Sequence, residues 1–533
     1  MEEKKKDINL DSVLESLGPY SRYNLLNFML LLFPVLLSSF FECGFIFEAQ
    51  AQNYRCKVPA CEDYNDTSWL QYAIPINPKT EKLETTLRYV AINGTVCGPA
   101  AFSNVTERCD SFVYEEGRSL VKEFDLGGQE WKRVLVGTVH NSGMFASMLV
   151  TGAVSDRFGR RVAVGIAALS SFIFGVIRAF SPNFLTYMSM HFLEAAFGGG
   201  LYPSAYVFAV ELVGLKQRVI VSAACNMTFV IGVVILALLA WLIDNWRTYI
   251  LVMYTPALIV ALYVWFMNES ARWLISKGRM SEAIKTLQAA AKINNMDPRQ
   301  LELYSLSNPL LASDNQTVDK SSQFSKALRS SIIWKRLFVC SFLWLTCSLV
   351  YYGLSINSVS LSSNKYISFM IVVLVEIPAY IVVVIVLDKY GRKRVILVNY
   401  VICAATSILF AFLPRSDYWS IPLYLVGKWC VTLTYSSVYI YVSEVFPTSM
   451  RQTLISFCST AGRIGSLIAP LTPLLTEYHK SMPTVLFGGM CLISSLLVIL
   501  LPETRNITLP DTIEEAEELS RKKPKTEYLQ VMR

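Results

Sequence analysis

The chain has 533 residues, of which 53% are hydrophobic and only 17% charged, and its formal net charge at pH 7 is +7. This balance is typical of a membrane protein with many spans and fits an ordinary soluble globule less well. The basic residues stand in short segments between apolar runs, not on a continuous basic face with aromatic residues. The charge therefore does not indicate a nucleic-acid partner.

Twelve apolar runs of about 20 residues each are predicted to cross the membrane. They cover residues 24–47, 133–153, 161–180, 184–210, 219–243, 247–267, 335–357, 367–387, 394–413, 419–443, 452–475 and 482–501. The first run is too long for the apolar core of a cleavable signal peptide, so we expect it to remain as a span.

An even number of spans places both termini on one side, and the basic hairpins between spans indicate that this side is the cytoplasm. The expected organisation begins with a cytoplasmic tail over residues 1–23 and a six-span bundle over 24–267, whose large extracellular loop covers 48–132. A cytoplasmic segment over 268–334, a second six-span bundle over 335–501 and a cytoplasmic tail over 502–533 follow.

The loop of residues 48–132 contains cysteines and glycosylation sequences that are typical of an extracellular segment. It carries an even number of cysteines, which predicts two disulfides and leaves their pairing open: Cys56, Cys61, Cys97 and Cys109. Three acceptor sequences predict N-linked glycans on Asn65, Asn93 and Asn104.

A short charged motif occurs once in each half of the chain. The first copy runs from Gly152 to Arg161 and the second from Asp388 to Arg394. Each copy lies between two apolar runs, which predicts a tight hairpin in which glycine gives the backbone its freedom. The separation of the copies corresponds to about six spans of roughly 20 residues with their loops. A duplicated six-span unit is the plan of many secondary transporters.

Charged residues at the cytoplasmic ends of the spans are expected to form an inner gate. The acidic members are Asp156, Glu211, Glu269, Asp388 and Glu444, and the basic members are Arg160, Arg218, Arg272, Arg392 and Arg451. Exposed ion pairs are individually weak, but a bias of a few kcal/mol is enough to shift a conformational equilibrium. The alternative is that these charges only orient the loops in the membrane.

Several motifs resemble those of known transporters. The hairpins resemble the conserved loop of the major facilitator superfamily, and Glu269–Leu274 resembles an element shared by its sugar porters and organic ion transporters. The Cys-rich first loop, Glu376–Tyr380, Glu444–Arg451 and Leu501–Thr504 together resemble the organic cation/anion/zwitterion (carnitine-type) family of solute carriers. The resemblance covers nearly the whole chain. It implies an all-α membrane protein with the twelve-span major facilitator fold, built of two pseudo-symmetric six-helix bundles.

Three ionisable residues lie deep in predicted spans of the second half: Glu376, Lys428 and Arg463. Ionisable groups inside the membrane are costly and mark a substrate or ion pathway by default. Arg463 and Lys428 can hold a carboxylate, and Glu376 can balance an ammonium group. In the family that the chain resembles, an arginine at this position accompanies anionic or zwitterionic substrates. The alternative is that the three residues pair with one another as structural ion pairs.

Further residues match pocket positions of that family: Trp344, Tyr351, Tyr435, Tyr206 and Asn226. Aromatic faces attract alkylammonium groups, although packing or lipid contact is an equal alternative for each ring. His191 and Glu194 could form a proton relay, but packing near the end of their span is favoured.

The sequence thus predicts a multi-pass plasma-membrane transporter that moves small organic ions by alternating access. Zwitterions or organic cations are the expected substrates, such as carnitine-like quaternary or primary amines. An organic anion transporter and a sugar-porter-like carrier are the alternatives. We expect no enzyme activity, cofactor or metal site, because no catalytic motif and no metal-ligand spacing is found. A coupling ion, Na⁺ or H⁺, is left unspecified.

Overall fold

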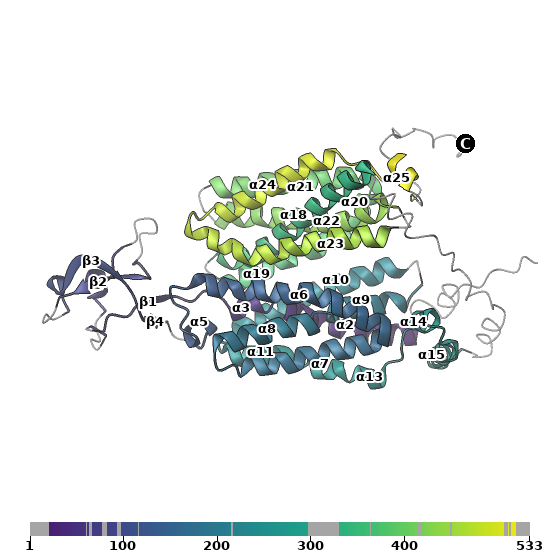
Figure 1. Ribbon diagram of the computed structural model, residues 1–533, viewed down its shortest axis with the longest axis horizontal. Coiled ribbons are helices and arrows are strands. Elements are labelled where there is room, and N and C mark those ends of the chain that lie inside the picture. Colours follow the sequence, from purple (N-terminus) through teal and green to yellow (C-terminus); the bar gives the residue numbers. More distant parts are fainter. Residues whose placement is uncertain are drawn as a thin grey trace, which may run out of the picture.

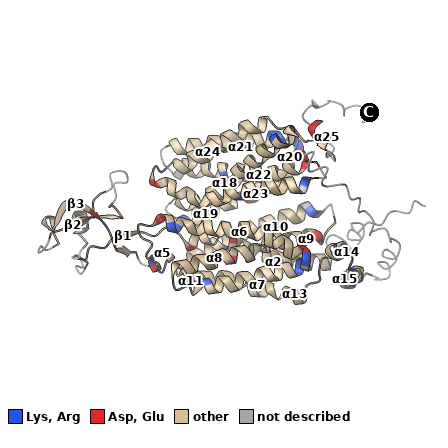
Figure 2. Cartoon of the chain, in the orientation of Figure 1, with Lys and Arg blue, Asp and Glu red and all other residues tan. Residues whose placement is uncertain are grey.

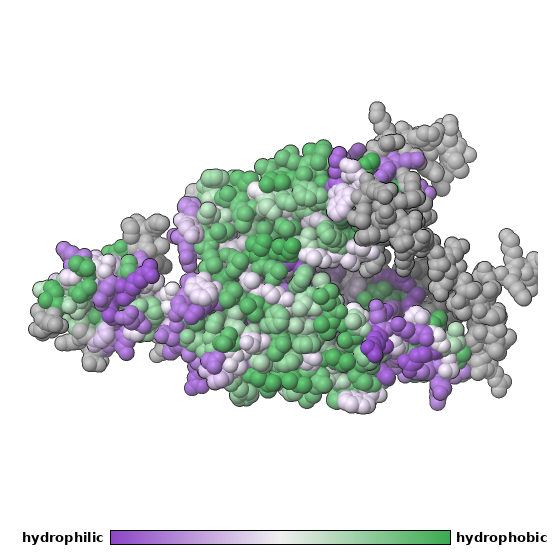
Figure 3. Space-filling view, viewed as in Figure 1, coloured by the Kyte–Doolittle hydropathy of each residue, from purple (hydrophilic) through white to green (hydrophobic). Residues whose placement is uncertain are grey.

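The computed structural model describes residues 21–59, 61–62, 67–76, 83–92, 97–115, 117–214, 217–296, 330–362, 364–413, 417–447, 450–505, 510 and 513–518. The helices of the first half pack into one bundle and those of the second half into another (Figure 1). The two bundles lie side by side, and their helices run roughly parallel to the long axis of the molecule. A small domain of short strands extends from one end. Charged residues gather at the two ends of the bundles (Figure 2), whereas apolar side chains cover the flanks (Figure 3).

The first bundle contains spans that are partly broken into shorter helices. Its elements are α2 (Arg22–Cys43), α3 (Phe45–Glu48), α6 (Glu130–Phe158), α7 (Arg160–Ala179), α8 (Phe184–Gly198), α9 (Leu201–Glu211), α10 (Arg218–Leu242), α11 (Trp246–Tyr254), α12 (Ala257–Ala261) and α13 (Tyr263–Phe266). The break between α11 and α12 falls at Pro256, which has no backbone N–H to donate into a helix. Phe40, Phe208 and Ile250 belong to the apolar core of this bundle.

The second bundle likewise contains spans that are partly broken into shorter helices. It consists of α18 (Ser331–Asn357), η4 (Ser358–Ser360), α19 (Lys365–Leu374), α20 (Glu376–Tyr390), α21 (Arg392–Phe412), α22 (Asp417–Val445), α23 (Arg451–Ile468), η5 (Ala469–Glu477) and α24 (Met482–Ile499), with the short helix α25 (Ile513–Glu518) behind it. Leu343, Tyr400 and Phe487 are buried in its core. In the described part of the chain, ten helical segments are long and apolar enough to cross a membrane. The two remaining expected spans correspond to α8 with α9 and to α22.

Two short helices lie between the bundles in sequence, at the end opposite the small domain (Figure 1). They are α14 (Ala271–Ser276) and α15 (Met280–Ile293). Ala283 and Ala291 of α15 are fully buried. Asn294, at the end of α15, accepts a hydrogen bond from the backbone N–H of Tyr23 at 3.0 Å. This contact ties the segment to the start of the first span.

The loop between α3 and α6, here called the loop domain (residues 49–129), contains the strands of the protein in the described ranges. β1 (Tyr54–Cys56) pairs with β4 (Phe112–Tyr114), and β2 (Leu87–Ala91) pairs with β3 (Phe102–Arg108), both antiparallel. The short helices are α4 (Leu70–Ala73), η1 (Pro99–Ala101) and α5 (Leu120–Glu123). Disulfides join Cys56 to Cys109 and Cys61 to Cys97. The cross-links close a core that is too small to be stable through apolar burial alone.

Of the three predicted glycosylation sites, Asn104 lies exposed on β3. Asn65 and Asn93 fall outside the described residues. The loop domain is attached to the first bundle by Glu123 of α5, whose carboxylate accepts hydrogen bonds from Arg247 at 2.6 Å and from Trp246 at 2.6 Å. The hydrogen bond from Arg247 lowers the pKa of the Glu123 carboxyl.

The two bundles touch each other mainly at the end that carries the loop domain. There α10 packs against α19, and α6 packs against η5. Tyr366 of α19 stacks on Phe47 and on Trp241, with ring centroids 5.7 Å and 6.0 Å apart. At the opposite end, a hollow opens between the bundles near α9 and α10 (Figure 3). The molecule is therefore closed at the loop-domain end and open at the other.

Candidate functional site

A buried ion pair lies in the middle of the second bundle. Lys428 Nζ of α22 is 2.8 Å from Glu376 Oε1, and the two side chains are 0% and 3% exposed. Glu376 is the first residue of α20, directly after the break at Val375 that separates it from α19. Two of the three predicted central charges are thus brought together.

Tyr351 of α18 encloses this pair. Its hydroxyl donates to Glu376 Oε2 at 2.7 Å, while Lys428 Nζ lies 3.4 Å from the centroid of its ring. The ammonium group also donates to Ser355 Oγ at 2.8 Å and to the Tyr351 carbonyl at 3.2 Å. Both carboxylate oxygens of Glu376 and the ammonium of Lys428 therefore have partners within the protein.

Arg463 of α23, the third predicted charge, has a different set of neighbours. Its guanidinium is within hydrogen-bonding reach of the Tyr352 hydroxyl and within electrostatic reach of Tyr435 and of the carboxylate of Glu42. Tyr352 donates to Glu42 Oε1 at 2.7 Å, which connects α18 of the second bundle to α2 of the first. Both Arg463 and Glu42 are only partly buried.

The two groups of charges belong to one region. Cys43, which follows Glu42, lies within electrostatic reach of both Glu376 and Lys428. The region therefore holds two carboxylates and two cations, and its formal charge is balanced across the interface of the bundles. A group with a single charge entering this region would disturb that balance, whereas a group with both charges would preserve it.

Aromatic residues line both sides of the same region. Tyr351 lies 5.5 Å from Tyr435, and Trp344 lies 5.5 Å from Tyr439, measured between ring centroids. On the first bundle, Tyr206 stacks on Tyr202 at 5.9 Å.

The predicted residues of the first bundle are held in place by their neighbours. The Tyr202 hydroxyl donates to Asn226 at 2.8 Å, and the Tyr206 hydroxyl lies 2.8 Å from Ser222 Oγ. Tyr202 is within electrostatic reach of Glu42 and Tyr435, so this tyrosine layer faces the second bundle.

Sequence reasoning missed three members of this region: Glu42, Tyr352 and Tyr202. Glu42 carries the signal that identified Glu376, because it is an ionisable residue inside a predicted span. The two tyrosines carry no such signal, since aromatic residues are common in spans and their roles depend on which way each helix faces.

The hairpin of the first bundle holds a cluster of charges around Arg160. This guanidinium lies 2.8 Å from Asp156 and 3.1 Å from Glu211. Glu269 accepts the backbone N–H of Arg160 at 2.9 Å, so its carboxylate caps the N-terminus of α7. Burial raises the pKa of the Glu269 carboxyl, and the backbone N–H groups oppose that rise. Gly159 has a φ of 103° in the tight connection between α6 and α7. Glycine adopts this backbone conformation readily, whereas a residue with a side chain would be strained there.

The second bundle repeats this cluster around Arg392. Its guanidinium lies 3.6 Å from Asp388 and 3.1 Å from Glu444. Glu503 accepts the backbone N–H of Arg392 at 2.9 Å and takes the place that Glu269 has in the first bundle. Gly391 adopts a φ of 89° at the equivalent turn. Glu503 was not among the predicted residues, although the symmetry of the two halves points to it.

The other predicted gate residues lie at the same end. Arg272 donates to the carbonyls of Glu211 and Val213, each at 3.2 Å. Arg218 and Arg451 begin α10 and α23, and Arg451 donates to the Phe446 carbonyl at 3.5 Å. The ion pairs around Arg160 join residues of the first bundle only, and those around Arg392 join residues of the second bundle only.

A separate cavity of about 520 Å³ lies at the loop-domain end, between α3, α6, α18 and η5. Its walls include Arg133, Asn357, Pro470 and Lys480 and contain none of the three predicted central charges. The cavity and the charged region thus lie in different parts of the interface between the bundles.

Comparison with known proteins assigns the chain to a family. The sugar (and other) transporter family matches residues 94–516. The chain is 30% identical to bovine solute carrier family 22 member 1, with 98% of this chain and 96% of that protein covered. It is 29% identical to an organic cation transporter protein of Drosophila melanogaster, with 96% and 95% covered.

Solved structures agree with the fold. A partially occluded inward-open conformation of the xylose transporter XylE from E. coli superposes with a TM-score of 0.58 at 15% identity, with 92% of this chain and 100% of that chain covered. At this identity the similarity shows the fold alone, and it confirms the predicted twelve-span architecture. The chain therefore belongs to the sugar (and other) transporter family of the major facilitator superfamily and, within it, to solute carrier family 22, and it is a multi-pass membrane transporter and not an enzyme.

Proposed function

We propose that this protein is a plasma-membrane secondary transporter of small organic ions, with zwitterions and organic cations such as carnitine-like quaternary amines or primary amines as its substrates. The observation that carries the proposal is the balanced set of charges between the bundles, in which Glu42 and Arg463 are the partly buried members. The organic-ion class is also supported by the name of the Drosophila relative.

Arg463 and Glu42 are the groups that we assign to the two ends of a zwitterion. An arginine can bind a carboxylate through two parallel hydrogen bonds, and a glutamate can balance an ammonium group. Glu42 accepts a hydrogen bond from Tyr352 and interacts electrostatically with Arg463. A zwitterion that places its ammonium group on Glu42 and its carboxylate on Arg463 would leave neither residue without a counter-charge. The tyrosines of both walls add cation–π attraction for an alkylammonium head, worth about 0.5–2 kcal/mol per ring.

Glu376 and Lys428, which the sequence also assigned to substrate, are proposed to position the pocket. Both oxygens of Glu376 already accept hydrogen bonds from Lys428 and Tyr351. Displacing either partner by a substrate would leave a buried charge uncompensated, which costs several kcal/mol. Contact of these two residues with substrate remains a prediction that the transport assays below also test.

Alternating access is supported by the opening of the molecule at one end only. We assign the loop domain to the outside of the cell, because it carries two disulfides and an exposed acceptor asparagine at Asn104. The hollow between the bundles then faces the cytoplasm, and the conformation is inward-open. The charge clusters around Arg160 and Arg392 lie at the rim of this opening, where they can bias the closing of the inner end.

Uptake by the purified protein in lipid vesicles tests the proposal. The probes are labelled carnitine, tetraethylammonium and an aryl carboxylate, and the variants are Arg463→Asp and Glu42→Gln. Arg279→Asp and Glu282→Gln, at nearly half-exposed positions, are controls that make the same changes of charge. Arg463→Asp should abolish uptake of carnitine and of the anion, and Glu42→Gln should weaken carnitine and the cation while sparing the anion. Losing a charged partner in a buried pocket typically costs 2–5 kcal/mol, or roughly thirty-fold to several thousand-fold in affinity.

Two results would contradict the proposal. Equal and small losses for all three probes in both variants would mean that neither side chain recognises substrate charge. Uptake of a neutral sugar in place of all three ions would favour the sugar-porter alternative.

A further inference from the structure

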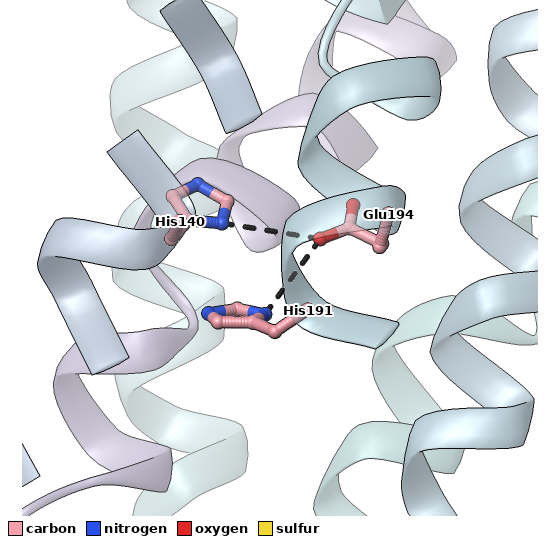
Figure 4. Close-up of side chains that lie close together, drawn as sticks. All are labelled: His140, His191 and Glu194. Carbon is pink, nitrogen blue, oxygen red and sulfur yellow. Dashed lines mark ion pairs between the residues drawn. The ribbon is translucent and has the colours of Figure 1, made fainter. Parts of the chain in front are cut away.

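Two histidines and a glutamate meet inside the first bundle, apart from the charged region between the bundles. His140 lies on α6, and His191 and Glu194 lie one turn apart on α8 (Figure 4). The Nδ1 atoms of both imidazoles are 3.9 Å from the same oxygen, Glu194 Oε2. One donor atom of each residue lies within 4.8 Å of the other two. Three side chains thus point at one common centre.

The polar atoms of this cluster have no hydrogen-bond partner. Among the described residues, neither ring nitrogen of either histidine and neither oxygen of Glu194 is paired. The three side chains are 1% exposed at most, so bulk water does not reach them. Buried polar groups in folded proteins are nearly always paired, and leaving one unpaired costs about 1–3 kcal/mol. Three of these six atoms, one from each residue, converge on one point, and this convergence indicates a ligand there.

The surrounding charges show which sign this ligand has. Arg178 of α7 lies 2.9 Å from Glu48, and Tyr187 donates to the second oxygen of Glu48 at 2.6 Å. The other groups that face Glu194 are Arg178 at longer range, Glu48 and the Tyr254 hydroxyl. Two carboxylates thus face one guanidinium, so the group would carry one excess negative charge when both carboxylates are ionised and the histidines are neutral. A cation at the centre would compensate that charge.

We propose that His140, His191 and Glu194 form a binding site for a divalent transition-metal ion of the zinc class. Two imidazoles and one carboxylate are a ligand set that zinc uses in proteins. A histidine and a glutamate three positions apart on one helix, completed by a residue of a facing helix, are a recurrent way to build metal sites in helix bundles. The ion would cross-link α6 and α8 within the first bundle.

The distances favour a metal ion over a shared proton. A proton shared between an imidazole and a carboxylate requires a nitrogen–oxygen distance below about 3.2 Å, and the observed distances are 3.9 Å. Ligand atoms of a tetrahedral zinc site are roughly 3.4 Å apart, given bonds of about 2.0–2.1 Å. The nitrogen–oxygen distances would shorten by about half an ångström when an ion binds, and the largest separation of ligand atoms, up to 4.8 Å, by roughly 1.4 Å. A water molecule can fill the fourth position.

Metal analysis of the purified full-length protein tests the site. After exposure to zinc and removal of free metal, the unmodified protein should retain about one zinc per chain. Glu194→Gln, which keeps the shape of the side chain, and His191→Ala should lose it. Ser189→Ala should retain it, because Ser189 is exposed on α8 and its hydroxyl donates to the carbonyl of Leu185.

Visible spectroscopy and thermal unfolding provide a second test of the site. Cobalt bound in place of zinc should give the visible absorption of a four-coordinate ion, and zinc should raise the apparent Tm of the unmodified protein but not that of Glu194→Gln. The proposal is overturned if the unmodified protein retains no metal and gives no such spectrum. It is equally overturned if Glu194→Gln and Ser189→Ala retain the same amount, because the ion would then bind elsewhere.

Discussion

Breaking the Glu376–Lys428 pair should destabilise the protein more than removing it. The two charged groups are 2.8 Å apart and almost fully buried. Glu376→Gln therefore leaves the Lys428 ammonium without its counter-charge, and Lys428→Met leaves the Glu376 carboxylate without its counter-charge. Removing one partner of a buried ion pair typically costs about 3–5 kcal/mol, whereas replacing both by neutral residues of similar volume is often close to neutral. The double variant should therefore recover most of the stability lost by either single variant.

Thermal unfolding of the purified variants in detergent measures this effect as a shift of the apparent Tm. Glu282→Gln is the matched control, because its partner Arg279 lies at 2.7 Å but both side chains are nearly half exposed, and such a pair contributes less than about 1 kcal/mol. Losses that simply add in the double variant would refute the reasoning, since the two residues would then act independently. Carnitine uptake by a stable double variant would also show that neither side chain is needed for substrate contact.

Three further predictions concern the ends of the molecule. Changing the three predicted acceptor asparagines of the loop domain to glutamine should abolish the mobility shift caused by deglycosylation; a shift that persists would place the glycans, and hence the outside of the membrane, elsewhere. Arg160→Ala should reduce transport, and it should change the equilibrium substrate affinity only as far as a shift between the inward-open and inward-closed states requires. Normal transport by this variant at equal surface expression would show that Arg160 is not part of the gate. The hydrogen bond from Arg247 lowers the pKa of Glu123 in the folded state. The stability that this contact gives α5 is therefore fully present above the ordinary glutamate pKa of about 4.3, and it is lost as the pH falls through the lower folded-state pKa. The protection of the backbone amides of residues 120–123 against hydrogen exchange, corrected for the intrinsic exchange rate at each pH, should fall at acid pH in the unmodified protein and show no such pH dependence in Glu123→Gln.

The sequence by itself determined the architecture of this protein. Whether a run of residues can cross a bilayer depends on its length and hydropathy, which are local properties of the chain. The hairpin around Arg160 could be recognised in the same way, because charged residues and a glycine between two apolar runs leave few other conformations. Glu376 was identified as a candidate site residue only because it is an ionisable residue within a predicted span. The same rule applied to Glu42 would have added the acidic partner from the first bundle.

Only the tertiary structure decided which residues meet. Glu376 could pair with Lys428 or with Arg463, and the choice depends on the rotation of α20, α22 and α23 about their axes, which is set by the packing of whole helix faces. The disulfide pairs depend likewise on the register of the strands in the loop domain. His140 lies far in sequence from the two ligands that it joins, so no local spacing reveals their common centre. Hydropathy fixes where each helix lies across the membrane, whereas contacts between distant helices fix the direction in which its side chains point.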